Sequence, residues 1–193
     1  MKKIGPVKVG DDTHIDDDVV LGYPGKYHRD ILLNGDKKKL ALTVLGNNVL
    51  IRDKTVVYED VVLEDDVQTG HHVLIREGCT VGSGSIVGSG TILEADCHIG
   101  RNVSIQSGVY LASGTVVKDD VFLGPRVCII NDKMMDSNIQ SVTIDKGARI
   151  GANATIIAGV DVGENAIVGA GSVVTHDVKK GAKVYGVPAC ERK

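Results

Sequence analysis

Two adjacent histidines, His71 and His72, lie in the stretch QTGHHVLIREG, residues 68–78 of a 193-residue chain that has six histidines. A neutral imidazole can accept a proton near neutral pH, and it can also bind a metal ion. Glu77 follows six residues after His71, so a carboxylate and an imidazole share one short segment. These residue types suit proton transfer from an acceptor group, provided that the fold brings them into one site.

A metal site at the two histidines is not favoured. Successive side chains of an extended chain diverge, so adjacent histidines rarely reach the same ion. We therefore expect no metal ligands in this chain. The other histidines are expected to be ordinary surface residues: His14, His28, His98 and His176. The four cysteines form no CxxC pair, which argues against zinc-ribbon spacing.

The segments that position these residues repeat every six residues. From Leu45 to Cys128, fourteen hexads run without a break, from LGNNVL to LGPRVC. Their first position is Leu, Ile or Val except at Thr69, and their fifth is Val, Thr, Ser or Cys. A helix has a shorter apolar period and a simple strand alternates, so a period of six fits neither. It predicts a short strand followed by a corner, repeated many times.

Further hexads extend the pattern along most of the chain. A second frame, shifted by three, covers residues 144–179, and a shorter one covers residues 9–26. The pattern resembles the hexapeptide-repeat acyltransferases, whose fold is an all-β, left-handed parallel β-helix with three hexads in each coil. We therefore expect one β-helix domain over residues 1–178, with loops protruding near 27–44 and 131–143. Residues 179–193 are expected to form a C-terminal tail.

The composition agrees with such a rod. Aromatic residues make up 3% of the chain, with one phenylalanine, Phe122, and no tryptophan. Stacked coils bury one continuous aliphatic column, and Gly, Asn and Asp in the third and fourth slots tolerate tight corners. With eighteen residues per coil, Cys79 lies below Cys97 as small inward filler. His71 is expected in one column with Ser89, Ser107 and Pro125.

The neighbourhood of His71 is similar to that of sugar N-acetyltransferases within this family, particularly those acting on nucleotide-linked amino sugars. The matching residues are Gly70, His71, Val73, Ile75, Arg76 and Glu77, then LGP at 123–125, and then Asn131 and Asp132. The resemblance implies that His71 is the base or orients the amine. Glu77 or Asp132 can act as the base if burial raises its pKa, or can simply orient the amine, and Asn131 can donate to an oxyanion or hold the sugar.

The C-terminal hexads resemble the acetyl-CoA-binding coils of these enzymes. They read IGANATIIAGVDVGENAIVGAGSVVTHDV, and VYGVPACERK follows. The resemblance implies acetyl-CoA as cosubstrate, with its pantetheine arm on the backbone of Gly151, Ala152, Gly169 and Ala170. Small residues let an extended arm lie close to the coil. The phosphates would then meet basic side chains at Lys179, Lys180 or Lys183.

Composition and family resemblance also limit which partners and which cellular compartment we expect. A net charge of −3 with interspersed signs provides no basic stripe for nucleic acid. No apolar segment has the length of a signal peptide core or a membrane span, so we expect a cytoplasmic protein without membrane contact. The family assembles as trimers with the active site between neighbouring rods, which implies a homotrimer here. Tyr110 and Phe122 are candidate interface residues.

Two other functions remain open from the sequence. The first is a sugar O-acetyltransferase, although family members that modify galactosides or maltose carry a catalytic histidine where the protruding loop begins. Here that loop begins NDKMMDSNIQS and has no histidine. The second is a non-catalytic β-helix scaffold, because such repeats need no chemistry to be stable.

Overall fold

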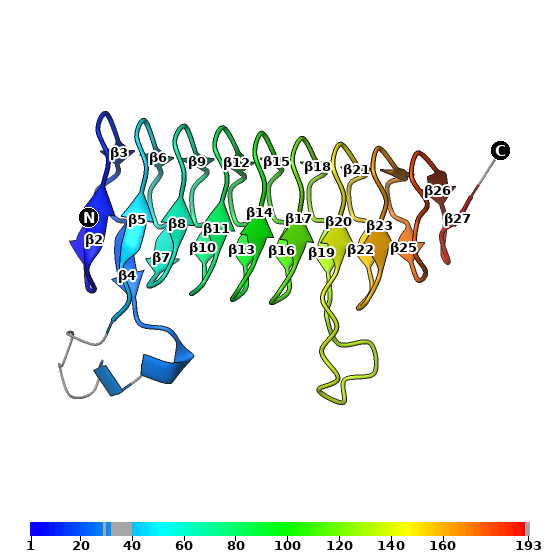
Figure 1. Cartoon of the computed structure of the whole chain (residues 1–193), viewed down its shortest axis with the longest axis horizontal. Helices are drawn as coiled ribbons and strands as arrows, with labels where there is room; N and C mark the ends of the chain where they lie inside the picture. The colour runs from blue at the N-terminus through cyan, green and yellow to red at the C-terminus, as the bar shows by residue number, and fades with distance from the viewer. Residues whose placement is uncertain (29, 32–39, 192–193) are drawn as a thin grey trace.

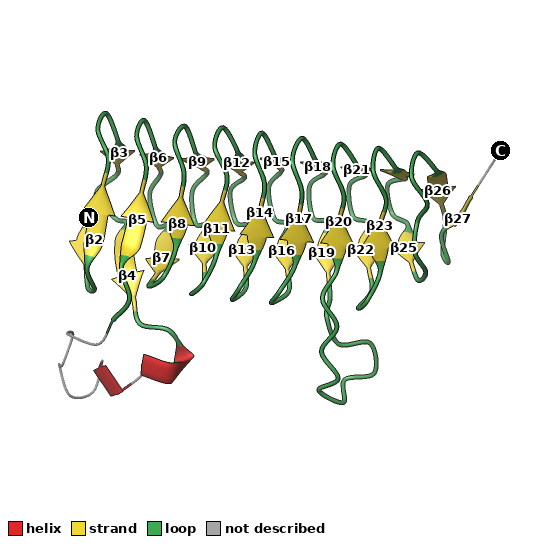
Figure 2. Cartoon of the chain, in the orientation of Figure 1, coloured by secondary structure: helices red, strands yellow, loops and turns green. Residues whose placement is uncertain are grey.

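A computed structural model of the chain describes residues 1–28, 30–31 and 40–191. They form a left-handed parallel β-helix whose coils stack into a straight rod (Figure 1). Figure 2 shows short strands joined by corners on three sides of the rod. The all-β prediction is thus confirmed. Part of the first expected loop, residues 29 and 32–39, lies outside the described residues.

Each side of the rod is one sheet. Sheet A contains β1 (Lys2–Lys3), β4 (Val20–Tyr23), β7 (Val56–Tyr58), β10 (Leu74–Ile75), β13 (Ile92–Leu93), β16 (Tyr110–Leu111), β19 (Cys128–Ile129), β22 (Thr155–Ile156) and β25 (Val173–Val174). Sheet B contains β2 (Val7–Val9), β5 (Thr43–Leu45), β8 (Val62–Leu63), β11 (Thr80–Val81), β14 (His98–Ile99), β17 (Val116–Val117), β20 (Thr143–Ile144) and β23 (Asp161–Val162). Sheet C contains β3 (His14–Ile15), β6 (Leu50–Ile51), β9 (Gln68–Thr69), β12 (Ile86–Val87), β15 (Ser104–Ile105), β18 (Phe122–Leu123), β21 (Arg149–Ile150), β24 (Ile167–Val168), β26 (Lys183–Tyr185) and β27 (Cys190–Glu191).

The hexad slots have fixed structural roles. First-slot residues such as Leu93 and fifth-slot residues such as Cys79 and Cys97 point inward and are fully buried. Fourth-slot residues from Asn48 to Arg126 all have positive φ, between 53° and 77°. That conformation is easiest for Gly, Asn and Asp, which explains why these types recur there. His72 is one of these corner residues, with φ of 56°.

The polar residues of the interior are satisfied by the backbone. Buried fifth-slot hydroxyls donate to backbone carbonyls, as Ser85 does to the Gly100 oxygen of the next coil at 2.8 Å. Among the described residues, no buried side-chain nitrogen or oxygen lacks a partner. Since an unpaired buried polar group costs about 1–3 kcal/mol, small polar residues enter this aliphatic column without destabilising it.

The C-terminal segment extends the rod. β26 pairs with β24 in parallel, and β27 turns back antiparallel to β26 at the end of sheet C. In the part of the chain that the structure describes, no helix has the length and apolar character needed to cross a membrane.

Candidate active site

Both protruding loops leave the rod at the same edge, between sheets A and B (Figure 1). The first follows β4 and the second follows β19, so five strand spacings, about 24 Å, separate them along the rod. We call this the loop edge. Between the loops, its corners carry Glu59, Glu77, Ala95 and Ser113, which are eighteen residues apart.

A cleft of about 250 Å³ lies beneath the first loop. One wall comes from the 3-10 helix η1 (Lys26–His28), and the other comes from successive corners of the loop edge. Its lining residues are Gly25, Lys26, Tyr27, His28, Ala41, Glu59, Asp60, Glu77, Gly78, Ala95 and Asp96. The cleft therefore combines four carboxylates, one lysine and one histidine in a concave surface.

Glu59 connects the first loop to the rod. It is 3% exposed and is the one buried carboxylate among the described residues. Its Oε1 accepts hydrogen bonds from the Gly25 nitrogen at 2.8 Å and from His28 Nδ1 at 2.7 Å, and its Oε2 accepts from the Ala41 nitrogen at 2.9 Å. One carboxylate thus holds the described residues at both ends of the loop and orients a histidine. The His28 side chain is thus 38% exposed and hydrogen-bonded to Glu59 rather than fully solvated.

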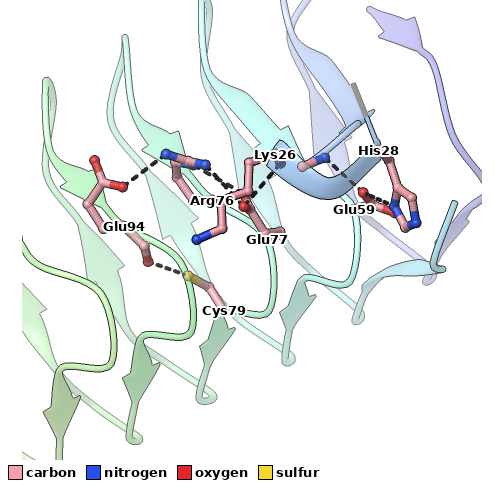
Figure 3. A network of polar contacts seen from close by, with 8 residues as sticks. Lys26, His28, Glu59, Arg76, Glu77, Cys79 and Glu94 are labelled. Carbon is pink, nitrogen blue, oxygen red and sulfur yellow. Dashed lines mark hydrogen bonds and ion pairs between the residues drawn. The ribbon is translucent and has the colours of Figure 1, made fainter. Parts of the chain in front are cut away.

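Glu77 is held in the cleft wall by a second set of polar contacts (Figure 3). Arg76 donates to both of its oxygens, at 3.0 and 3.1 Å, and also to Glu94 at 3.1 Å. The Lys26 backbone nitrogen adds a longer contact at 3.4 Å. Burial raises the pKa of Glu77, but these hydrogen bonds outweigh it, and the net pKa is lowered. The condition under which Glu77 would act as a base, a raised pKa, is not met.

His71 lies on a different edge, between sheets C and A. Its side chain is exposed, its backbone nitrogen donates to Ser89 Oγ at 3.1 Å, and its carbonyl accepts from Gly90. The same ladder of backbone hydrogen bonds continues through the corners above it. We call this the histidine edge, and its column is His71, Ser89, Ser107, Pro125, Ala152 and Ala170.

Ala152 and Ala170 therefore stand in the column of His71, and Gly151 and Gly169 precede them at the same corners. Local packing also explains why glycine occupies both positions. A Cβ on Gly151 would overlap the backbone nitrogen of Ala170, and a Cβ on Gly169 would overlap the Tyr185 ring. Coil stacking thus accounts for Gly151, and the close approach of Tyr185 accounts for Gly169.

The basic residues expected at the phosphates are close to the C-terminal coils but not on the histidine edge. Lys179 and Lys180 lie at the corner between sheets B and C, and Lys183 begins β26 in sheet C. All three are exposed, and Lys180 Nζ contacts Glu164 Oε2 at 2.6 Å. Sheet C separates the first two from Ala152 and Ala170, so only a long ligand would reach both groups.

Asn131 and Asp132 lie at the start of the second loop on the loop edge. Asn131 Nδ2 donates to the Ser113 carbonyl at 2.9 Å, which fixes the loop to the corner below. The Asp132 carboxylate accepts from the backbone nitrogens of Asp136 and Ser137 at 3.2 and 2.9 Å. Both side chains thus shape the loop within this chain.

The structure groups the predicted residues into two edges rather than one site. Glu77, Asn131 and Asp132 share the loop edge, whereas His71 is on the histidine edge. His71 and Glu77 flank β10, so they belong to the same coil and lie at the same level along the rod. A six-residue span reaches roughly 20 Å at most. His28 and Glu59 were not predicted as site residues, because no pattern in the sequence indicates that they are in contact.

Two family models match separate segments of the chain. "Bacterial transferase hexapeptide (six repeats)" matches residues 78–113, and "Hexapeptide repeat of succinyl-transferase" matches residues 141–176. Together with the coiled fold and its corner residues, these matches define a hexapeptide-repeat protein. In these two segments, the chain is similar to hexapeptide-repeat transferases.

Two curated relatives share part of their length with it. The bifunctional protein GlmU of Streptococcus suis is 31% identical over 180 residues, which cover 89% of this chain and 38% of the relative. The dTDP-3-amino-3,6-dideoxy-α-D-galactopyranose 3-N-acetyltransferase of Aneurinibacillus thermoaerophilus is 50% identical over 46 residues, 24% of each chain. The chain thus spans well under half the length of either relative.

Solved structures show the same architecture. The UDP-N-acetylglucosamine acyltransferase of Campylobacter jejuni matches with a TM-score of 0.62 and 17% identity, covering 99% of this chain and 71% of the other. The polySia-specific acetyltransferase NeuO matches with a TM-score of 0.59 and 20% identity, covering 97% and 85%. At these identities, the likeness establishes the fold.

Proposed function

We propose that this protein is an acetyl-CoA-dependent N-acetyltransferase that acylates the amine of a nucleotide-linked amino sugar. The observation that carries the proposal is the histidine edge. Its column runs from Ala170 and Ala152 through Pro125, Ser107 and Ser89 to His71, over five coil spacings or about 24 Å. An extended pantetheine arm can follow such an edge and end at an imidazole. The amino-sugar N-acetyltransferase relative supports the choice of acceptor.

In this proposal, the backbone of Gly151, Ala152, Gly169 and Ala170 binds the pantetheine arm. The adenine nucleotide extends over sheet C, where Lys183 faces solvent and Lys179 and Lys180 stand at the far corner. These three cations suit the phosphates of the cosubstrate.

The acceptor site is formed by two chains. His71 is on one edge of a rod, whereas Glu77, Asn131 and Asp132 are on another edge of the same rod. In a homotrimer with its axis parallel to the rods, the histidine edge of one chain faces the loop edge of the next chain, and equivalent coils lie at the same height along the axis. His71 of one chain then meets the cleft beside Glu77 of its neighbour, because both lie in the same coil. Asn131 and Asp132 position the second loop beside the bound acceptor.

A thiol-release assay tests the proposed activity. The full chain is incubated with acetyl-CoA and nucleotide-linked sugars that carry either an amine or a hydroxyl at the acceptor carbon. We expect free thiol and an amide product with the amine only, and about a 100-fold lower rate for His71→Ala. His14→Gln, a change at an exposed histidine of β3, is the matched control. An ester product would indicate an O-acetyltransferase, and no thiol release with any sugar would favour a scaffold.

A further inference from the structure

The pair formed by His28 and Glu59 has the geometry of an oriented proton acceptor. Both Glu59 oxygens accept hydrogen bonds from backbone nitrogens, Oε1 from Gly25 and Oε2 from Ala41. The carboxylate is therefore an acceptor toward His28 Nδ1 at 2.7 Å, and Nδ1 carries the hydrogen. That tautomer leaves the Nε2 lone pair free, because a carboxylate at one ring nitrogen fixes the state of the other.

The surroundings of His28 suit a small cationic or amine group. Its side chain is 38% exposed, whereas that of Glu59 is 4% exposed, so the orienting group is shielded while the imidazole faces the cleft. Figure 3 shows the two side chains in contact, with Glu77 further along the same edge. The other ionisable groups that line the cleft are Lys26, Tyr27, Asp60, Glu77 and Asp96. Three of these five are carboxylates, which attract an amine.

The size of the cleft limits what it can hold. Its volume of about 250 Å³ is below the ~300–1,000 Å³ of sites for drug-sized ligands. A single sugar ring bearing an amine is therefore a more suitable occupant than a whole nucleotide sugar. The nucleotide would remain outside the cleft, along the loop edge.

We infer that His28, oriented by Glu59, accepts the proton of the acceptor amine in this cleft. The inference rests on the proposed function and assigns proton transfer to His28, which leaves His71 to orient the thioester end. The neutral amine attacks the thioester carbonyl carbon, and a C–N bond forms. His28 Nε2 takes a proton from the attacking nitrogen. As the C–S bond breaks, that proton passes to the departing sulfur, so the products are an amide and a free thiol.

The test compares His28→Gln, His28→Ala and Glu59→Gln with the wild-type chain and with His14→Gln. The rate of thiol release is measured across pH with saturating acetyl-CoA and a nucleotide-linked amino sugar. We expect kcat to fall about 100-fold in His28→Gln while KM changes little. Glu59→Gln should lower kcat and alter the pH profile, because the carboxylate that selects the tautomer is gone. His14→Gln should match the wild type.

Imidazole rescue separates a chemical role from a structural one. Added imidazole should restore the rate of His28→Ala in proportion to its concentration, because a free base can occupy the vacated cleft. Acetyl-CoA binding, measured by calorimetry, should be unchanged in all variants. Full activity of His28→Gln, or a loss in His28→Ala that imidazole does not restore, would overturn the assignment. If the wild type itself releases no thiol with any amino sugar, the proposed function fails first and the inference fails with it.

Discussion

Replacing Gly88 by alanine should lower the free energy of unfolding by about 3 kcal/mol. Gly88 occupies the second slot of its hexad, where the corner of one coil lies directly on the corner of the next. A Cβ there would be 2.5 Å from the Gln106 carbonyl carbon and 2.6 Å from the Ser107 nitrogen. Since both neighbours are backbone atoms within the coil stack, neither can move without disturbing adjacent coils. Chemical denaturation followed by circular dichroism measures the change.

The matched control is Gly90→Asn, two residues further along the same corner. Gly90 has φ of 68°, and a Cβ at this position would meet nothing within 4 Å. Asparagine tolerates this conformation, as Asn153 does at the equivalent corner with φ of 56°. We expect the free energy of unfolding to change by less than about 0.5 kcal/mol. Equal effects of the two substitutions would contradict the stacking account.

Replacing Glu59 by leucine should release the first loop while the rod stays folded. The change removes the acceptor of the Gly25 and Ala41 nitrogens and of His28 Nδ1. Each donor left unsatisfied costs about 1–3 kcal/mol, so the loop should open about 100-fold more often. Lys26 is exposed within this loop, and tryptic cleavage after it reports the opening.

Glu164→Leu provides the comparison for this experiment. Glu164 lies at the corner between sheets B and C, and its carboxylate contacts Lys180 at the surface. Its replacement should leave the cleavage rate after Lys26 unchanged. A Glu59→Leu protein that resists trypsin as the wild type does would show that the loop is held by other contacts. The cleft under the loop would then not depend on this carboxylate.

The period of six predicted the repeated strand and corner, because each slot has one structural role, and the family resemblance implied the left-handed β-helix. A first-slot aliphatic residue points inward and a fourth-slot residue turns the corner, so the sequence predicts where Leu93 and His72 lie. Stacking by eighteen also placed His71 correctly in one column with Ser89, Ser107 and Pro125. Because each slot keeps the same structural role in every hexad, these roles can be recognised from the sequence.

The candidate site was less predictable because it depends on the insertions. Val20 pairs with Val56 and Cys128 with Thr155, so the loops add eighteen and nine residues to the coil period. The nine-residue insertion explains the frame shift of three after the second loop. Counting hexad slots onward from Tyr58 places the start of the second loop on the same edge of the rod as the first. The sequence of the first loop has no hexad repeat, so the periodicity could not predict the contact between His28 and Glu59.

The most direct test of the account is a calorimetric titration of the full chain with acetyl-CoA. The histidine edge, with its small residues at Ala152 and Ala170, predicts saturable binding of one acetyl-CoA per chain. A bulky substitution on that edge, Ala152→Leu, should weaken the binding, because the side chain would occupy the path of the pantetheine arm. Absence of binding at millimolar acetyl-CoA would contradict the acetyltransferase assignment and leave the rod as a structural module.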